Sequence, residues 1–293
     1  MATITHPFQI VRATPEERRQ GELAPAHLAA VLSSIGEHGA AIVLDAVDID
    51  ACDALREAML AELEEAARLP AALEVPGHVQ HTPPPSAAHL HADLFANPTA
   101  TSVCRALLGR GIHLALYTGN TMLGHTTTSQ PVHWDEPQLW PSLPHAAPAH
   151  SLTINIPLVD VTEDNGALEL WPGTHLDVRS GARVGDGLLV PEEWLEARRR
   201  EVPPVRVPVP KGALLLRDGR VWHCGTTNTT PEPRPMLAMV YSAWWFRALP
   251  IDFHTDAQPV LEAAGVRVTA RYRDEFDHLA WPPDWDIVAK PVD

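Results

Sequence analysis

The chain has 293 residues, of which 45% are hydrophobic and 20% are charged, close to the average of folded soluble proteins. This balance excludes a disordered chain, a coiled coil and a collagen, and the length allows one large domain with a substantial core. Acidic residues outnumber basic ones by 37 to 22, giving a net charge of −15. Such a charge argues against DNA, RNA and anionic membranes as partners and is compatible with a cationic small molecule.

Cysteine content and hydropathy indicate where the protein works. Three cysteines without a CxxC pair are typical of a reducing compartment. The first residues lack the apolar core of a signal peptide, and no apolar run approaches the ~20 residues of a membrane span. We therefore expect a cytoplasmic protein whose partner is a small molecule, with no membrane and no nucleic acid bound. The oligomeric state stays open.

The first hundred residues are expected to be mostly helical. Pro25 suits the first turn of a helix, and Gly39 and Gly109 suit helix C-terminal ends. In chain order, the expected elements are a helix over 25–37, a strand over 41–44, a helix from Asp48 or Asp50 to about 69, and a helix over 97–108.

From residue 112 the pattern changes to short strands separated by Gly, Pro, Asn and Asp turns, which is typical of a sandwich or jelly roll. The 29 prolines, about twice the usual ~5%, also favour short strands joined by stiff loops. The expected strands cover 112–122, 151–161, 167–171, 213–216, 221–223 and 236–245, with a helix inserted at 191–200. We predict a single domain with a helical layer and first strand over about 1–110, a β core over about 111–246 and a C-terminal extension over 247–293.

Four His-x-Asp pairs are the main candidates for chemistry. Strand side chains alternate, so such a pair on a strand points to one side. With a distant histidine it can form the 2-His-1-carboxylate triad of non-haem Fe(II) oxygenases. The pairs are His91/Asp93, His133/Asp135, His175/Asp177 and His254/Asp256.

Context favours His133/Asp135, which alternates with apolar Val132 and Trp134 just ahead of the main run of strands. His223, expected on a short strand, is the candidate third ligand. Arg234 follows eleven positions later, and a hairpin loop between them could return its guanidinium to the same pocket. A guanidinium there is suited to bidentate binding of a carboxylate.

Three ordered segments carry a family resemblance: QPVHWD at 130–135, NGALELWPGTH at 165–175, and His223 followed by Arg234. Together they resemble the phytanoyl-CoA dioxygenase family over most of residues 30–246. That resemblance implies an Fe(II)- and 2-oxoglutarate-dependent dioxygenase that oxidises a small natural product with O2. It also implies a double-stranded β-helix, a cupin-like jelly roll, and makes His175 a structural residue of its segment.

The resemblance also implies roles for particular residues. His133, Asp135 and His223 would ligate Fe(II), and Arg234 would bind the distal carboxylate of 2-oxoglutarate. Further candidates for holding 2-oxoglutarate are Thr226, Gln130 and Asn120. Candidates for contacting the substrate are Trp134, Glu136, Trp140, His78 and Gln80, with Trp244 or Trp245 as further walls.

Other interpretations stay open at this point. The substrate could be an aminocyclitol-like cation, for which Glu136 and Glu169 are the acidic candidates, or a neutral terpenoid or polyketide. A jelly-roll metalloenzyme that works without 2-oxoglutarate would leave Arg234 without a task. A sugar-binding jelly roll without catalysis would not need the triad.

Overall fold

The computed structural model describes residues 7–69, 75–140, 142–181, 188–246 and 249–280. Its α-helices are α1 (Pro15–Gln20), α2 (Pro25–His38), α3 (Ile49–Ala61), α4 (Leu63–Ala66), α5 (Ala92–Phe95), α6 (Pro98–Leu108), α7 (Glu192–Glu201) and α8 (Gln258–Ala263). Single turns of 3-10 helix cover Thr174–Leu176, Val178–Gly181 and Thr255–Ala257. In this part of the chain, no helix is both long and apolar enough to cross a membrane.

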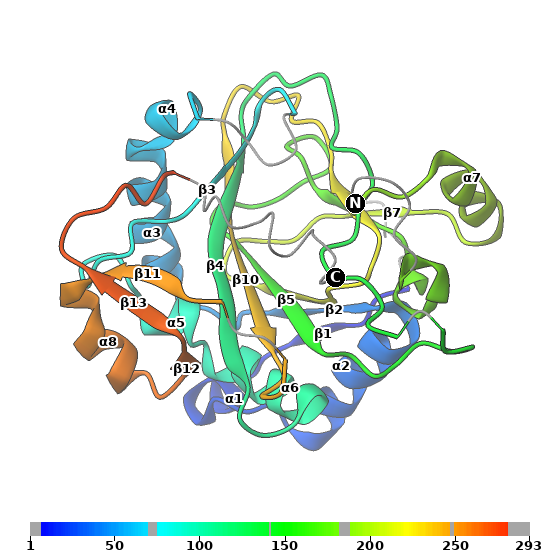
Figure 1. Ribbon diagram of the computed structural model, residues 1–293, viewed down its shortest axis with the longest axis horizontal. Helices are drawn as coiled ribbons and strands as arrows, with labels where there is room; N and C mark the ends of the chain where they lie inside the picture. Colours follow the sequence, from blue (N-terminus) through cyan, green and yellow to red (C-terminus); the bar gives the residue numbers. More distant parts are fainter. Residues whose placement is uncertain (1–6, 70–74, 141, 182–187, 247–248, 281–293) are drawn as a thin grey trace.

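The strands belong to three sheets (Figure 1). The large sheet contains β1 (Ile10–Arg12), β2 (Ala40–Leu44), β8 (Leu214–Asp218), β5 (Ser151–Pro157), β10 (Arg234–Ser242), β4 (His113–Met122) and β12 (Arg267–Val268) in this spatial order, and β3 (His78–His81) also pairs with β4. The small sheet has the order β7 (Val205–Val207), β6 (Leu168–Leu170) and β9 (His223–Gly225). A separate pair joins β11 (Ile251–His254) to β13 (Ala270–Arg273).

An apolar layer joins the large sheet to the small one. It contains Ile42 of β2, Leu215 of β8 and Met236 of β10, together with Leu168 of β6 and Val207 of β7. These residues are buried, so the two sheets enclose a common interior. The expected double-stranded β-helix, or jelly roll, with a helical N-terminal layer is confirmed.

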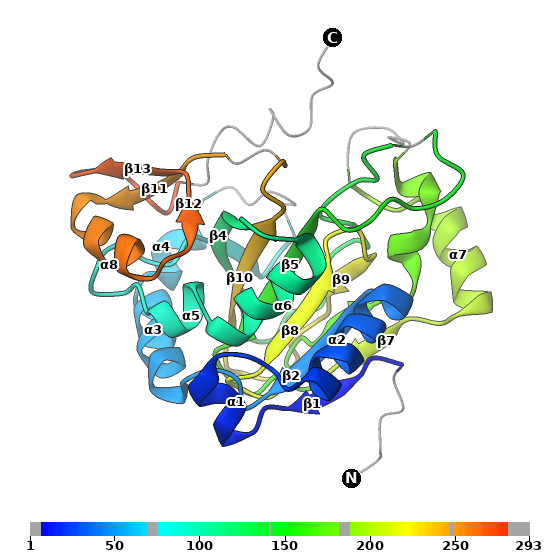
Figure 2. The same ribbon diagram turned by 90° about the horizontal axis from the view of Figure 1, so that it is seen from below.

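The opposite face of the large sheet is covered by helices, as Figure 2 shows for α2, α3 and α6. Val31 and Ile35 of α2, Leu55 and Met59 of α3, and Val103 of α6 are buried in the core on this side. The spacing of three or four residues places such side chains on one helix face. The helical layer therefore fixes the sheet whose other face carries the candidate site.

Most N-terminal elements match the expectation in detail. Pro25 begins α2, and Gly39 ends it in the left-handed conformation. Asp48 is the N-cap of α3, with its side chain accepting from the Asp50 N–H, and Asn97 caps α6 in the same manner. The expected single helix to residue 69 is wrong, because the ladder is interrupted at Glu62 and α4 starts after it.

Other differences lie in the β region. β5 ends at Pro157, which has no N–H for the ladder, and β10 ends at Ser242, so Trp244 and Trp245 lie beyond it. Strands β1, β3, β7, β11, β12 and β13 were not expected, because they are only two to four residues long and carry little periodic signal. Residues 281–293 of the expected C-terminal extension lie outside the described residues.

Glu17 connects α1 to the start of α2 and predicts a pH-dependent stability. Its carboxylate accepts hydrogen bonds from the N–H groups of Thr14 and Ala24 and contacts the His27 ring. Burial opposes ionisation, but these bonds dominate and lower the pKa of Glu17 to about 2.

A lowered pKa in the folded state stabilises the protein above the carboxyl group's ordinary pKa. That stabilisation is lost as the pH falls from about 4.5 towards 2. Glu17→Gln is therefore expected to lower the melting temperature at pH 7, and by less at pH 3. Equal losses at both pH values in thermal unfolding would contradict this account.

Candidate active site

The candidate metal ligands meet at the end of the small sheet where β9 begins. His223 begins β9, and His133 lies in an irregular segment that forms one-residue bridges with His223 and Leu189. The backbones of His133 and His223 exchange two N–H···O bonds, of 2.9 and 2.8 Å. The N–H of Asp135 donates to the carbonyl of Gly219 at 2.9 Å. The expectation that His133 and Asp135 share a strand is therefore wrong, because the bridge is only one residue long.

These residues nevertheless bring their ligand atoms together. One atom from each of His133, Asp135 and His223 lies within 4.8 Å of the others. Asp135 Oδ1 is 3.5 Å from His223 Nε2 and 4.0 Å from His133 Nε2. Among the described residues, this is the group of His, Cys, Asp or Glu side chains with a spacing suited to one metal ion.

Second hydrogen bonds set the orientation of both imidazole rings. The Nδ1 of His133 is 2.9 Å from the carbonyl oxygen of Pro131, and the Nδ1 of His223 is 2.9 Å from that of Val221. A carbonyl only accepts, so each Nδ1 carries the proton. Each Nε2 is then left with its lone pair for a metal.

The charge states at neutral pH also suit a cation. Burial lowers the pKa of both histidines, and the neighbouring Arg217 lowers that of His223 further. Burial alone would raise the pKa of Asp135, but Arg217 and the two histidines hold it well below its ordinary value. Neutral imidazoles and an ionised carboxylate are the forms that bind divalent metals.

The other three His-x-Asp pairs have structural contacts instead. His91 is the N-cap residue of α5, and Asp93 accepts from the Asp48 N–H. His175 Nε2 lies 3.1 Å from the Gly36 carbonyl and so braces its segment against α2. In the fourth pair, Asp256 accepts from the Ala87 N–H at 3.2 Å.

Arg234 is the first residue of β10, and its side chain is 1% exposed. It donates from Nη1 to Asn120 Oδ1 at 2.9 Å and from Nη2 to the Gly166 carbonyl at 2.8 Å. Its Nε is buried without a hydrogen-bond partner, and no described Asp or Glu forms an ion pair with it. Burial lowers the pKa of Arg234 to about 10, so it stays charged at neutral pH. A buried, uncompensated guanidinium is a site for a carboxylate from outside the chain.

Arg234 reaches this position by a different route from the expected hairpin. β9 pairs with β6, whereas β10 pairs with β4 and β5, so the loop between His223 and Arg234 crosses from one sheet to the other. Burial, and with it the nearby Arg234 and His133, lowers the pKa of His78 on β3 to about 3, so its ring is neutral at neutral pH.

A model of the phytanoyl-CoA dioxygenase (PhyH) family matches residues 35–236, more than half of the chain. The chain belongs to the phytanoyl-CoA dioxygenase family. As a member it is a dioxygenase that uses Fe(II), 2-oxoglutarate and O2.

Solved structures share the fold of this chain. The non-haem α-ketoglutarate-dependent epimerase SnoN from nogalamycin biosynthesis, in complex with Fe3+, α-ketoglutarate and nogalamycin RO, is 20% identical with a TM-score of 0.59, covering 75% of this chain and 85% of that one. The carbocyclase SnoK from the same biosynthesis is 19% identical with a TM-score of 0.57 over 75% and 84%. EctD from S. alaskensis, solved with 2-oxoglutarate and 5-hydroxyectoine, is 21% identical with a TM-score of 0.58 over 80% and 79%.

The residues present fit both cofactors of the phytanoyl-CoA dioxygenase family. The oriented triad offers two nitrogen atoms and one oxygen atom, the donor set of non-haem iron sites. The unpartnered Nε of Arg234 offers a buried donor for the distal carboxylate of 2-oxoglutarate.

The other candidates for holding 2-oxoglutarate already have protein partners. Asn120 accepts from Arg234, so it orients that guanidinium. Gln130 accepts from the Gly225 N–H at 2.8 Å, so its amide donates to His78 Nδ1 at 3.1 Å. The Thr226 hydroxyl donates to the Ala167 carbonyl at 2.8 Å, which leaves its oxygen as an acceptor only.

The structure separates the candidates for substrate contact. His78 and Gln80 occupy β3 beside β4, with His78 buried and Gln80 partly exposed. Trp140 is 48% exposed. Trp134 is only 1% exposed and packs in a core cluster with Trp171 and Trp222. The prediction that Trp134 contacts the substrate is therefore wrong.

The two acidic candidates differ in the direction that they face. Glu136 follows Asp135 and lies 3.5 Å from His150, with 18% of its side chain exposed. Glu169 pairs with Cys224 in the small sheet, whereas His223 pairs with Leu170. Because neighbouring strand residues alternate, Glu169 faces away from His223, and its proposed place near the pocket is wrong.

Residues that the motifs did not indicate surround Asp135. Arg217 of β8 and Thr153 of β5 both bind its Oδ2, at 2.7 and 3.2 Å. The available signal was a charged pair, Arg217 and Asp218, directly after the apolar run Leu214–Leu216.

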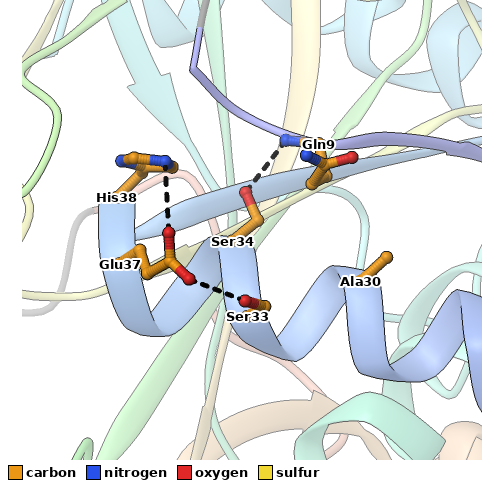
Figure 3. A pocket seen from close by; sticks show the side chains of 6 residues that line it. All are labelled: Gln9, Ala30, Ser33, Ser34, Glu37 and His38. Atoms are coloured by element: carbon orange, nitrogen blue, oxygen red, sulfur yellow. Dashed lines mark hydrogen bonds and ion pairs between the residues drawn. The ribbon is translucent and has the colours of Figure 1, made fainter.

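A hollow of about 220 Å³ between α2 and the segment that precedes β1 is a separate feature (Figure 3). It is lined by Gln9 and by side chains of α2, among which Ser33 donates to Glu37 and Ser34 accepts from the Gln9 N–H. None of the candidate metal or 2-oxoglutarate residues lines it.

Proposed function

We propose that this dioxygenase oxidises a small natural product, with His133, Asp135 and His223 as its iron ligands and Arg234 as the anchor for 2-oxoglutarate. Two observations together carry the proposal. The ligand atoms of His133, Asp135 and His223 lie within 4.8 Å of one another, and the buried Arg234 has an Nε without a hydrogen-bond partner. Bound Fe(II) supplies O2-dependent oxidation, in which 2-oxoglutarate is converted to succinate and CO2. The chain's own residues place the 2-oxo acid, hold the substrate C–H bond and exclude water.

The direct test is succinate formation by purified protein under defined metal conditions. We expect slow conversion of 2-oxoglutarate that requires Fe(II) and O2 and is accelerated by the true substrate. Absence of Fe(II)-dependent succinate across a broad substrate panel would contradict the proposal.

Asp135 bears on the type of oxidation. Related halogenases have Gly or Ala in place of this carboxylate, which admits chloride to the metal. The intact carboxylate therefore favours hydroxylation, or a similar oxidation, over halogenation.

For the substrate class, we favour an amine-bearing natural product such as an aminocyclitol or aminoglycoside. The segments 75–80, 117–120, 130–141 and 234–239 resemble kanamycin B dioxygenase, which acts on an aminoglycoside. The neighbours SnoN and SnoK belong to nogalamycin biosynthesis, and EctD was solved with 5-hydroxyectoine. The net charge of −15 also attracts cations.

A rim next to the metal ligands offers the matching contacts. The Glu136 carboxylate lies 3.5 Å from His150 Nε2. The His150 ring in turn packs against Phe246, with ring centroids 4.6 Å apart. Trp245 directly precedes Phe246 and packs against it, with ring centroids 6.0 Å apart, and its own ring centroid lies 6.2 Å from that of Trp140. Both tryptophans are about half exposed. A partly exposed carboxylate, joined through His150 and Phe246 to two exposed indole rings, suits an ammonium group on a saturated ring.

We expect Glu136→Gln to raise the KM of an aminocyclitol substrate about fivefold at low salt, equivalent to about 1 kcal/mol for a partly exposed ion pair. The difference should shrink at high salt, because ions screen the attraction over ~8–10 Å. Glu169→Gln, on the far face of the small sheet, is the matched control and should leave KM unchanged. Substrate-stimulated succinate release reports both effects.

A neutral terpenoid or polyketide is the competing substrate class. Stimulation by neutral apolar compounds alone, insensitive to salt and to Glu136→Gln, would establish it and leave the dioxygenase assignment intact. A jelly-roll metalloenzyme working without 2-oxoglutarate is disfavoured, because it would leave the buried charge of Arg234 without a counter-charge.

A further inference from the structure

Arg217 is a charged residue in the interior of the large sheet. It lies on β8, all five residues of which are buried, and is itself 4% exposed. In the sheet register it pairs with Thr153 of β5. A buried arginine is costly unless its charge and its donors are satisfied, so its partners indicate its role.

The guanidinium contacts Asp135, Asn155 and His223, and the shortest of these contacts is the one with Asp135. The contact with His223 is a long one, with Nη1 3.4 Å from Nδ1. Arg217 Nη2 donates to Asp135 Oδ2 at 2.7 Å, and the Thr153 hydroxyl donates to the same oxygen at 3.2 Å. Arg217 Nε donates to Asn155 Oδ1 at 3.1 Å, which fixes the guanidinium plane. Oδ2 is thus occupied by two protein donors, whereas the other carboxylate oxygen, Oδ1, is the one near both histidine Nε2 atoms.

We propose that Arg217 is a positioning residue that restricts Asp135 to one-oxygen ligation and offsets its negative charge. The inference rests on the ligand set proposed above, and it does not depend on the substrate class. One-oxygen ligation leaves three of six positions open, the number needed for chelating 2-oxoglutarate and O2. A carboxylate freed at both oxygens could take one of those positions.

The charge of Arg217 has opposite consequences for the two cofactors. A fixed positive charge beside Asp135 disfavours a dication at the triad. The same charge leaves the loaded site more positive and so favours the dianion 2-oxoglutarate. Arg217 therefore lowers the affinity for the metal and raises the affinity for 2-oxoglutarate. A residue needed only for folding would change both affinities in the same direction or neither.

The experiment uses Co(II), whose absorption spectrum reports its coordination number, with metal-free full-length protein. For Arg217→Met we expect about tenfold tighter Co(II) binding, about tenfold weaker 2-oxoglutarate binding to the Co(II)-loaded protein, and an altered Co(II) spectrum. Arg217→Gln, which removes the charge but keeps a donor, should shift both affinities in the same directions with a near-native spectrum. Arg217→Lys, which keeps the charge, should stay near native in both affinities.

Arg206→Met, which removes an exposed positive charge from β7, is the matched control and should change neither affinity. Far-UV circular dichroism establishes that each variant is folded, and Arg217→Gln carries the test if the Met variant does not fold. Native affinities in a folded Arg217→Met or Arg217→Gln variant, or weaker binding of both cofactors, would overturn the role of Arg217 and leave the ligand set standing. Failure of the native protein to bind Co(II) would overturn the ligand set and this inference with it.

Discussion

Replacing His133 or His223 by alanine is expected to abolish Fe(II)-dependent succinate formation and to weaken Fe(II) binding by more than about 100-fold. Each variant loses one of three ligand atoms that lie within 4.8 Å of one another. Changes in residues that merely orient ligands typically cost 10–100-fold, and loss of a ligand should cost more. Anaerobic Fe(II) titration and succinate quantification measure the two effects.

His91→Ala and His175→Ala are the matched controls, because both histidines belong to His-x-Asp pairs outside the triad. Both variants should bind Fe(II) as the native protein does. His175→Ala should also unfold at a lower temperature, since it loses the contact with the Gly36 carbonyl. Loss of iron from His175→Ala with retention in His133→Ala would show that the wrong pair had been chosen.

Replacing Arg234 by leucine is expected to raise the KM for 2-oxoglutarate by about 100-fold or more. Removing one partner of a buried carboxylate–guanidinium pair costs about 3–5 kcal/mol, because the other charge is left uncompensated. Arg234→Lys keeps the charge but loses the forked donor geometry, so its KM should be intermediate. The titration is made with the metal saturating.

Fe(II) affinity provides the control for Arg234, because its side chain contacts Asn120 and Gly166 but none of the proposed ligands. Fe(II) binding by Arg234→Leu should therefore stay close to native. An unchanged KM for 2-oxoglutarate in this variant would remove Arg234 from the site.

The fold class could be predicted because turn residues and short apolar runs recur along 112–245, and helix ends carry local signals such as Pro25, Gly39 and Asp48. What could not be predicted is pairing between distant segments. β9 and β10 are close in sequence but lie in different sheets, and nothing local to the loop between them encodes that crossing.

The candidate ligands could be chosen because the family segments contain them in order. Their geometry has a different origin from the one expected, since a single bridge between His133 and His223, rather than a strand, aligns them. Arg217 was missed because its role depends on the register of β8 beside β5, which sequence spacing does not reveal. Trp134 was misplaced because a tryptophan next to a ligand could face either the pocket or the core.

The most direct test of the site is a crystal structure of the anaerobic complex with Fe(II) and 2-oxoglutarate, using the anomalous signal of iron. We expect one iron peak bound by the Nε2 atoms of His133 and His223 and by Oδ1 of Asp135, with the distal carboxylate of 2-oxoglutarate on Arg234. An iron peak at another His-x-Asp pair, or 2-oxoglutarate bound away from Arg234, would contradict the account.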